Sequence, residues 1–309
     1  MITASAPGKV ILFGEHSVVY GRPAIAAPVF NVSASAQIEA GGPGFRVVAP
    51  DLARDFWLRD ALPDEPLAAA IRAVLAHFAL DELPPGTLTV QSTIPLGRGL
   101  GSGAAIAAAM VRALAAFLGR SISPADVSAL VFEVEKLHHG TPSGIDNTVI
   151  AFAQPVYFIK ERPIQRLRVA RPFTLVIGDT GVVAPTHRVV GALRQRWQAN
   201  PQRYEGYFDE IAVIARHAKL AIEQEVVAVS ALGKLMDENQ EILEAMGVSS
   251  PELAGLIAAA RAAGAWGAKL SGAGGGGNMI ALVPPEIVAA VQTALVAAGA
   301  SGVIVTEIR

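Results

Sequence analysis

The chain has 309 residues, of which 52% are hydrophobic and 17% are charged, so it can build sizeable buried cores and disorder is not its expected state. Lys and Arg number 25 against 27 Asp and Glu, without a basic run, which argues against nucleic acid or anionic membrane as a partner. Cysteine is absent, which excludes disulfides, thiolate metal ligands and cysteine nucleophiles and fits a cytoplasmic location.

The amino terminus and the most apolar stretch show no sign of export or membrane insertion. Glycine, glutamate and histidine interrupt the first residues, MITASAPGKVILFGEHS, so we expect no signal peptide and a chain that begins as mature protein. The stretch from Ala104 to Leu118 is too short to cross a bilayer and carries Arg112 near its middle. We therefore expect a buried helix there.

The first half of the chain mixes strand and helix signals. Alternating apolar and polar residues predict strands at 32–38 and, more weakly, at 87–93. Apolar residues recur at three- and four-residue spacing between 66 and 80, which predicts an amphipathic helix. A further helix is expected from its N-cap Ser123 to Gly140, with proline at the first helical position.

The second half predicts a layer of helices and strands. We expect helices from Thr186 to about Leu243, from Ser250 onward and from Pro285 to Ala298, and strands at 173–178, near 266–270, near 278–283 and at 302–308. This order is typical of an α+β fold, and we place a domain boundary near residue 168. The predicted domains are thus 1–168 and 169–309.

Four glycines stand between the second strand and the alanine-rich helix. They are Gly97, Gly99, Gly101 and Gly103, and the first turn of the helix runs from Ser102 to Ala105. A helix start offers unpaired N–H groups and about half a positive charge, and glycine lets a phosphate come close to the backbone. The pattern predicts a phosphate-binding loop at a helix N-terminus. The alternative is a tight turn packed beneath a buried helix.

Two widespread phosphate motifs do not explain this loop. The P-loop pattern G-x-x-x-x-G-K-[ST] does not occur in the sequence. Gly99, Gly101 and Ala104 satisfy G-x-G-x-x-A, but the next acidic residue is Asp126, which opens a helix instead of ending a second strand. A nicotinamide-dependent oxidoreductase is therefore disfavoured.

Two further stretches resemble a known family. APGKVILFGEHSVVYGRPAIA at 6–26 and AKLSGAGGGGNMIAL at 268–282, together with the glycine loop, resemble the three motifs of the GHMP kinases. Within that superfamily, Lys9, HGTPSGIDN at 139–147 and IGDTGVVAPTHRVV at 177–190 are most similar to the mevalonate kinase family, whereas galactokinases carry arginine at the lysine position. The resemblance spans both halves of the chain.

The resemblance implies a two-domain α+β GHMP kinase fold with its active site between the domains. It also implies ATP-dependent phosphorylation of the 5-hydroxyl of (R)-mevalonate, a step of isoprenoid biosynthesis. Asp146 matches the catalytic aspartate of the family and Lys9 its partner lysine. Phosphoryl transfer requires positioning and charge stabilisation, and an ammonium group near Asp146 would keep that carboxylate ionised.

Magnesium is the metal that the resemblance implies. Glu135 falls where the family places its metal-ligating glutamate, and the second family ligand is a serine in GLGSSA. Here the loop reads GLGSGA, so Gly103 replaces that serine and Ser102 carries the loop's hydroxyl group. Mg²⁺ takes few protein ligands beside water and phosphate, and we expect Ser102 or a water molecule to compensate.

The remaining site residues are carried over from the family motifs. Nucleotide binding is expected from Gly97, Gly99, Leu100, Gly101, Ser102, Gly103 and Ala104. Mevalonate binding is expected from Glu15, His16, Ser143 and Thr186, and the third loop, Gly272, Ala273 and Gly274, is expected to lie against the phosphates and close the site. The family also makes a homodimer possible.

Other functions stay open at this point. Phosphomevalonate kinase or a galactokinase-like enzyme would keep the fold, and Arg188, Arg194 and Arg196 could serve a phosphorylated substrate. A non-catalytic ligand sensor is favoured by Gly103 but disfavoured by the retained catalytic set.

Two other chemistries are disfavoured. A zinc site at His138 and His139 is disfavoured because adjacent residues diverge around a helix and no third ligand stands at a suitable spacing. Serine hydrolysis at Ser143 lacks the G-x-S-x-G turn.

Overall fold

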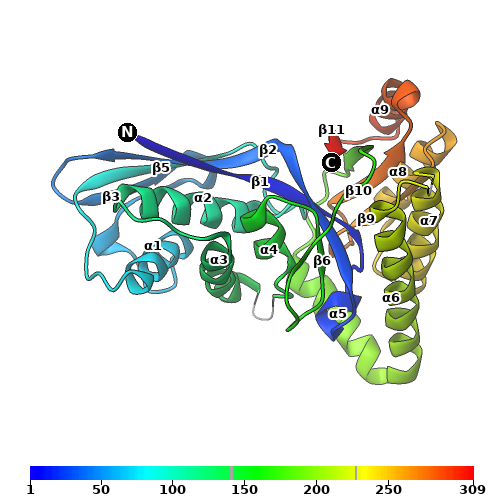
Figure 1. Cartoon of the computed structure of the whole chain (residues 1–309), viewed down its shortest axis with the longest axis horizontal. Helices are drawn as coiled ribbons and strands as arrows, with labels where there is room; N and C mark the ends of the chain where they lie inside the picture. The colour runs from blue at the N-terminus through cyan, green and yellow to red at the C-terminus, as the bar shows by residue number, and fades with distance from the viewer. Residues whose placement is uncertain (140–141, 227) are drawn as a thin grey trace. The chain divides into compact units, whose positions relative to one another are not determined.

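The computed structural model describes residues 1–139, 142–226 and 228–309 (Figure 1). Contacts divide the chain into two units. The first unit comprises Met1–Gly8, Val32–Pro95 and Gly101–Ala153, and the second comprises Lys9–Asn31, Leu96–Leu100 and Gln154–Arg309. Both units mix strands and helices, which confirms the predicted α+β class.

The first unit contains a sheet whose central strand is longer than the sequence predicts. The alternation at 32–38 belongs to β2 (Ala24–Ala40), which pairs antiparallel with β5 (Gly86–Ser92). β5 pairs in parallel with β3 (Phe45–Ala49), and β3 pairs antiparallel with β4 (Arg54–Trp57). β1 (Ile2–Phe13), which the sequence analysis did not predict, also pairs with β2. Short 3-10 helices lie at Pro50–Leu52 and Leu58–Asp60.

Helices lie along one face of this sheet (Figure 1). They are α1 (Pro66–His77), α2 (Ser102–Phe117), α3 (Pro124–His139) and α4 (Ile145–Phe152). The alanine-rich α2 packs against the other three, because its small side chains allow close approach on several sides. Ser123 caps α3 as predicted, accepting a hydrogen bond from the backbone N–H of Asp126 at 3.1 Å. Gly140, the expected end of this helix, lies outside the described residues.

The second unit contains an antiparallel sheet with the order β11-β8-β10-β9. Its strands are β8 (Phe173–Asp179), β9 (Gly267–Ser271), β10 (Asn278–Val283) and β11 (Gly302–Ile308). α7 (Ser230–Ala245) and α8 (Pro251–Ala262) pack on β9 and β10, and α9 (Val288–Ala297) packs on β8 and β11. The shared core includes Val176, Phe208, Leu243, Leu256, Leu270, Met279 and Leu295.

The helical stretch expected from Thr186 to Leu243 is divided into three helices. α5 (Thr186–Ala199) ends where Pro201 begins α6 (Pro201–Glu223), and the side chain of Asn200 caps α6. Proline fits the first helical position but would break a helix interior, which explains why the predicted, mainly helical stretch divides at this point. Similarly, the last helix begins as a 3-10 turn, Pro285–Ile287, before α9. A 3-10 turn also occurs at Ser17–Tyr20.

The units are not continuous along the chain. β1 and β2 each run from one unit into the other, and the start of β2 pairs with β6 (Val156–Phe158), which in turn pairs with β7 (Gln165–Arg166). These units differ from the domains 1–168 and 169–309, so a boundary at residue 168 stays a prediction. None of the described helices has the length and apolar character needed to span a membrane.

Candidate active site

The nucleotide loop, residues 96–103, leads into α2, and three of its glycines adopt left-handed backbone conformations. The φ angle is 68° at Gly97, 83° at Gly99 and 75° at Gly101, values that residues with a Cβ atom rarely adopt. Gly101 is the N-cap of α2, and no side chain caps this helix start. The first N–H groups of α2 can therefore bind an anion, which the helix dipole also favours. Gly97, Gly99 and Gly103 are exposed, Gly101 and Ser102 are half-buried, and Leu100 and Ala104 are buried.

The second unit holds the first part of this loop from two sides. The backbone N–H of Lys9 in β1 donates to the carbonyl oxygen of Leu100 at 3.0 Å. On the other side, the Arg98 guanidinium donates to Asp179 Oδ1 at 2.8 Å, and the side-chain amide of Asn278 donates to the Arg98 carbonyl oxygen. Asp179 at the end of β8 and Asn278 at the start of β10 thus fix Arg98, the residue next to Gly99.

Gly103 and Glu135 lie together in the first unit. A Cβ atom on Gly103 would be 3.6 Å from Glu135 Oε1, and the Glu135 side chain on α3 is buried. The position where the family carries serine therefore faces this carboxylate. Within the described chain, no group of three or more acidic, histidine or cysteine side chains could hold a metal ion.

Asp146 lies in the first turn of α4 in the same unit. It is half-buried. Its neighbour Asn147 is buried. The Asn147 side-chain amide donates to the Ser128 carbonyl oxygen at 3.0 Å and to Ser128 Oγ at 2.9 Å. This anchor fixes the turn that carries the carboxylate. Ser143 Oγ accepts a long hydrogen bond from the Ile145 N–H at 3.4 Å.

The first motif meets the third glycine loop inside the second unit. His16 Nε2 lies 2.9 Å from the carbonyl oxygen of Ala273, and Lys269 donates to Glu15 Oε1. A Cβ atom on Gly272 would lie 3.8 Å from the Gly99 Cα, so the third loop also touches the nucleotide loop. Gly272 and Gly274 have φ angles of 98° and 80°. The structure therefore brings three separately predicted segments together.

Burial controls the ionisation of these groups. Burial raises the pKa of Glu15, although the nearby charges of Lys269 and Lys9 act against it. Burial lowers the pKa of Lys269, opposed by Glu15. Burial also lowers the pKa of His16 to about 4, so this imidazole is neutral at pH 7. Because Ala273 offers an acceptor, the neutral His16 carries its proton on Nε2.

Other predicted residues differ in exposure. The Lys9 side chain is 2% exposed and lies in the part of β1 that belongs to the second unit. Thr186 is exposed at the first position of α5, after a loop whose residue Val183 approaches Gly97. The side chains of His138 and His139, considered above for zinc, lie outside the described part of the chain.

Several site-forming residues escaped the sequence analysis. Lys269, Ser271 and Asn278 lie within the quoted third motif, but no role was given to them. Lys269 is fully buried in β9, between Ala268 and Leu270. A lysine flanked by apolar residues in a short strand is the signal that would have indicated a buried charge with a partner.

Comparison with known proteins shows the family. The model of the GHMP kinases N terminal domain matches residues 66–154, and the model of the GHMP kinases C terminal domain matches residues 226–301. Together they cover more than half of the chain. The chain therefore belongs to the GHMP kinase family, and it is an ATP-dependent kinase that acts on an alcohol group.

Within this family, mevalonate kinases are among the proteins similar to this chain. The one from Pyrococcus horikoshii is 38% identical over 304 residues, which cover 92% of this chain and 89% of the relative. The one from Thermococcus onnurineus is 37% identical over 324 residues, which cover 98% and 95%. The crystal structure of L. major mevalonate kinase in complex with R-mevalonate matches with a TM-score of 0.84 and 27% identity, covering 100% of this chain and 96% of that one. The resemblance inferred from the motifs is confirmed.

Proposed function

We propose that this chain transfers the γ-phosphoryl group of ATP to the 5-hydroxyl of (R)-mevalonate, with Mg²⁺ bound. The observation that carries the proposal is the meeting of His16 with Ala273 and of Gly272 with Gly99, since it joins a substrate motif to the two loops assigned to phosphate. Relatives named mevalonate kinase, similar over nearly the whole chain, support the substrate.

The proposed roles follow from charge and geometry. Asp146 orients the attacking hydroxyl or accepts its proton, and the Lys9 ammonium stabilises the charge that develops on the transferred group. The backbone N–H groups at the start of α2 bind phosphate oxygens. Glu135, with Ser102 or a water molecule, would hold the metal. When bound, Mg²⁺ neutralises phosphate charge and helps align the transferred group.

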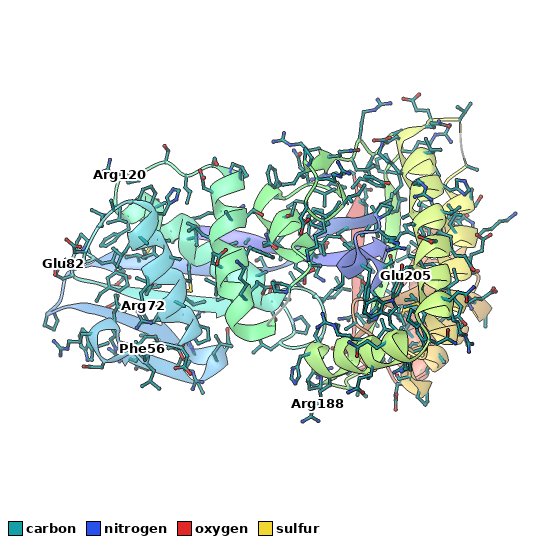
Figure 2. The ribbon with its side chains drawn as sticks, turned by 90° about the horizontal axis from the view of Figure 1, so that it is seen from below. Phe56, Arg72, Glu82, Arg120, Arg188 and Glu205 are labelled. Atoms are coloured by element: carbon teal, nitrogen blue, oxygen red, sulfur yellow. The ribbon has the colours of Figure 1, made fainter. Side chains whose placement is uncertain are left out.

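Of the three arginines considered for a phosphorylated substrate, Arg196 already has backbone partners. The Arg196 guanidinium donates to the backbone oxygens of Met246 at 2.5 Å and Gly247 at 3.0 Å, so it is engaged by the end of α7. Arg188 is exposed, and Figure 2 shows its side chain extending away from the ribbon. A galactokinase would carry arginine at Lys9. A homodimer and a cytoplasmic location stay predictions.

The test is ADP release by the purified protein with ATP and Mg²⁺. Mevalonate, galactose, homoserine and 5-phosphomevalonate are offered separately, and we expect turnover with mevalonate alone. Asp146→Asn should lower kcat by at least about 100-fold with little change in ATP affinity, because general-base and orienting groups contribute on that order. Asp126→Asn is the matched control, since Asp126 also lies in the first turn of a helix but bonds Ser123. Equal turnover by Asp146→Asn and Asp126→Asn would refute the mechanism.

A further inference from the structure

The turn after β1 is strained. His16 has φ 61° and ψ −49°, close to the rare γ-turn with positive φ, and the Ser17 N–H donates to the Glu15 carbonyl oxygen at 2.7 Å, as that turn requires. Such a conformation costs free energy in a residue with a Cβ atom and persists only where surrounding contacts impose it. Strain of this kind concentrates at functional sites.

Contacts from β9 and the third glycine loop impose this turn. Ser271 Oγ accepts from the Ile11 N–H at 2.9 Å and donates to the Ile11 carbonyl oxygen at 3.1 Å, which fixes the strand before the turn. Lys269 holds Glu15 at the first residue of the turn. Ala273 accepts from His16 at its centre. Lys269 and Ser271, at alternate positions of β9, thus bind β1 and its turn, and the loop after β9 accepts a hydrogen bond from the His16 imidazole.

The Glu15–Lys269 pair cannot serve solvent-facing chemistry directly. Both side chains are 0% exposed, and the Lys269 ammonium donates a second hydrogen bond to the Leu270 carbonyl oxygen at 2.7 Å. Glu15 Oε2 is buried without a hydrogen-bond partner among the described atoms. A buried pair is a costly way to gain stability, because desolvation offsets the attraction, and apolar replacements of both members are often tolerated. Such a pair is better explained by the geometry that it fixes.

We propose that Lys269 is a positioning residue, which through Glu15 holds the strained His16 turn against the third glycine loop. The inference deepens the proposed function, on which it rests for the identity of the substrate. Lys269 touches no substrate. It determines where the neutral imidazole of His16 stands and ties the loop next to Gly99 to the first motif, so an alcohol bound at His16 and phosphates at the loops keep one fixed spacing.

The experiment compares Lys269→Met, Glu15→Leu and the double variant Glu15→Leu/Lys269→Met. Each is measured for Tm, for KM and kcat with mevalonate, and by nitrogen-detected NMR of the histidine rings, with His16 assigned by the His16→Asn variant. The control is the double variant Glu223→Leu/Lys219→Met, which removes an ion pair from α6 in the same unit.

The single variants should lose stability because each leaves an unpaired buried charge, whereas the double variant should recover a Tm near that of the wild type. We expect its KM for mevalonate to stay raised by about tenfold or more, since a small misplacement of a binding group costs that much. The His16 Nε2–H signal of the neutral ring should shift or broaden in the double variant and stay unchanged in the control.

A double variant whose KM and His16 signal both return to wild-type values would overturn the proposal, because the pair would then be purely structural. A double variant that no longer melts cooperatively would also overturn it, since the pair would then serve the fold. If the wild type does not phosphorylate mevalonate, the proposed function fails on its own. In that case the His16 signal still decides whether Lys269 positions the turn.

Discussion

Gly103 stands where the family resemblance predicts a metal-ligating serine, and its surroundings show what a side chain there would meet. Its φ angle is not in the left-handed region, unlike that of Gly101, and a Cβ atom would make an ordinary contact with Glu135. A serine side chain therefore fits at this position, next to the carboxylate.

We expect Gly103→Ser to keep kcat within a few-fold and to lower the Mg²⁺ concentration needed for half-maximal turnover, because it adds a hard oxygen ligand beside Glu135. A magnesium titration at saturating ATP measures this. Gly101→Ser is the matched control and should lose ATP affinity, since serine is strained at φ 75°. Loss of ATP binding in Gly103→Ser would contradict our placement of the loop.

His16 should make the stability of the protein depend on pH. Its pKa is about 4 in the folded state and 6.5 as the reference value, so the unfolded state binds more protons between these values. The free energy of unfolding then falls on acidification, by about 2 kcal/mol between pH 7 and pH 5 from this group. Urea unfolding of the wild type and His16→Asn at both pH values measures the difference, and parallel losses in the two proteins would argue against a buried neutral imidazole.

At the scale of elements, α2 has two roles: its first N–H groups are proposed to bind phosphate, and its middle packs against neighbouring elements. Arg112, in the middle of α2, donates to the carbonyl oxygens of Ser5 and Ala151, both at 2.8 Å, and so joins the helix to β1 and to the end of α4. Burial lowers the pKa of this guanidinium. Arg112 thus satisfies backbone groups in two neighbouring elements.

We expect Arg112→Leu to lower the free energy of unfolding by about 1–3 kcal/mol, because the buried Ala151 carbonyl oxygen and the exposed Ser5 carbonyl oxygen both lose a charged donor. Arg120→Leu is the control, as Arg120 is exposed beyond the end of α2 and Figure 2 shows it at the edge of the molecule. Chemical denaturation compares the two. Equal changes would mean that the contacts of Arg112 add nothing to stability.

The elements also show how far local sequence signals reach. Ser123 capped a helix as predicted because the cap depends on residues three positions apart. The break before α6 was missed although Pro201 marks it. The partner of Lys269 could not be predicted locally, because Glu15 is 254 positions away in the sequence. The strained turn at His16 depends on the same distant contacts.

At the scale of the whole molecule, the chain passes between its two units within β1 and β2. The second unit includes Lys9–Asn31, which carries Glu15 and His16, together with everything after residue 153. Sequence periodicity cannot reveal this, because it reports which face of an element is buried and not which unit buries it. The three motifs still identified the family, since each carries a recognisable glycine or charge pattern.

We expect a fragment of residues 169–309 not to fold cooperatively by itself. It would keep Lys269 and Ser271 in β9 but lose Glu15 and Ile11, leaving a buried ammonium without its carboxylate. Thermal melting by circular dichroism, compared with the intact chain, measures this. A cooperative, native-like transition in the fragment would support the boundary at residue 168 instead.

The central claim is that the site phosphorylates one hydroxyl of one alcohol. Phosphorus–proton correlation NMR of the product formed from ATP, Mg²⁺ and (R)-mevalonate tests it most directly. We predict a single new phosphate ester whose phosphorus couples to the protons on carbon 5, formed by the wild type and not detectably by Asp146→Asn in the same time. A phosphate on another position, or no ester despite measurable ATP binding, would contradict the account.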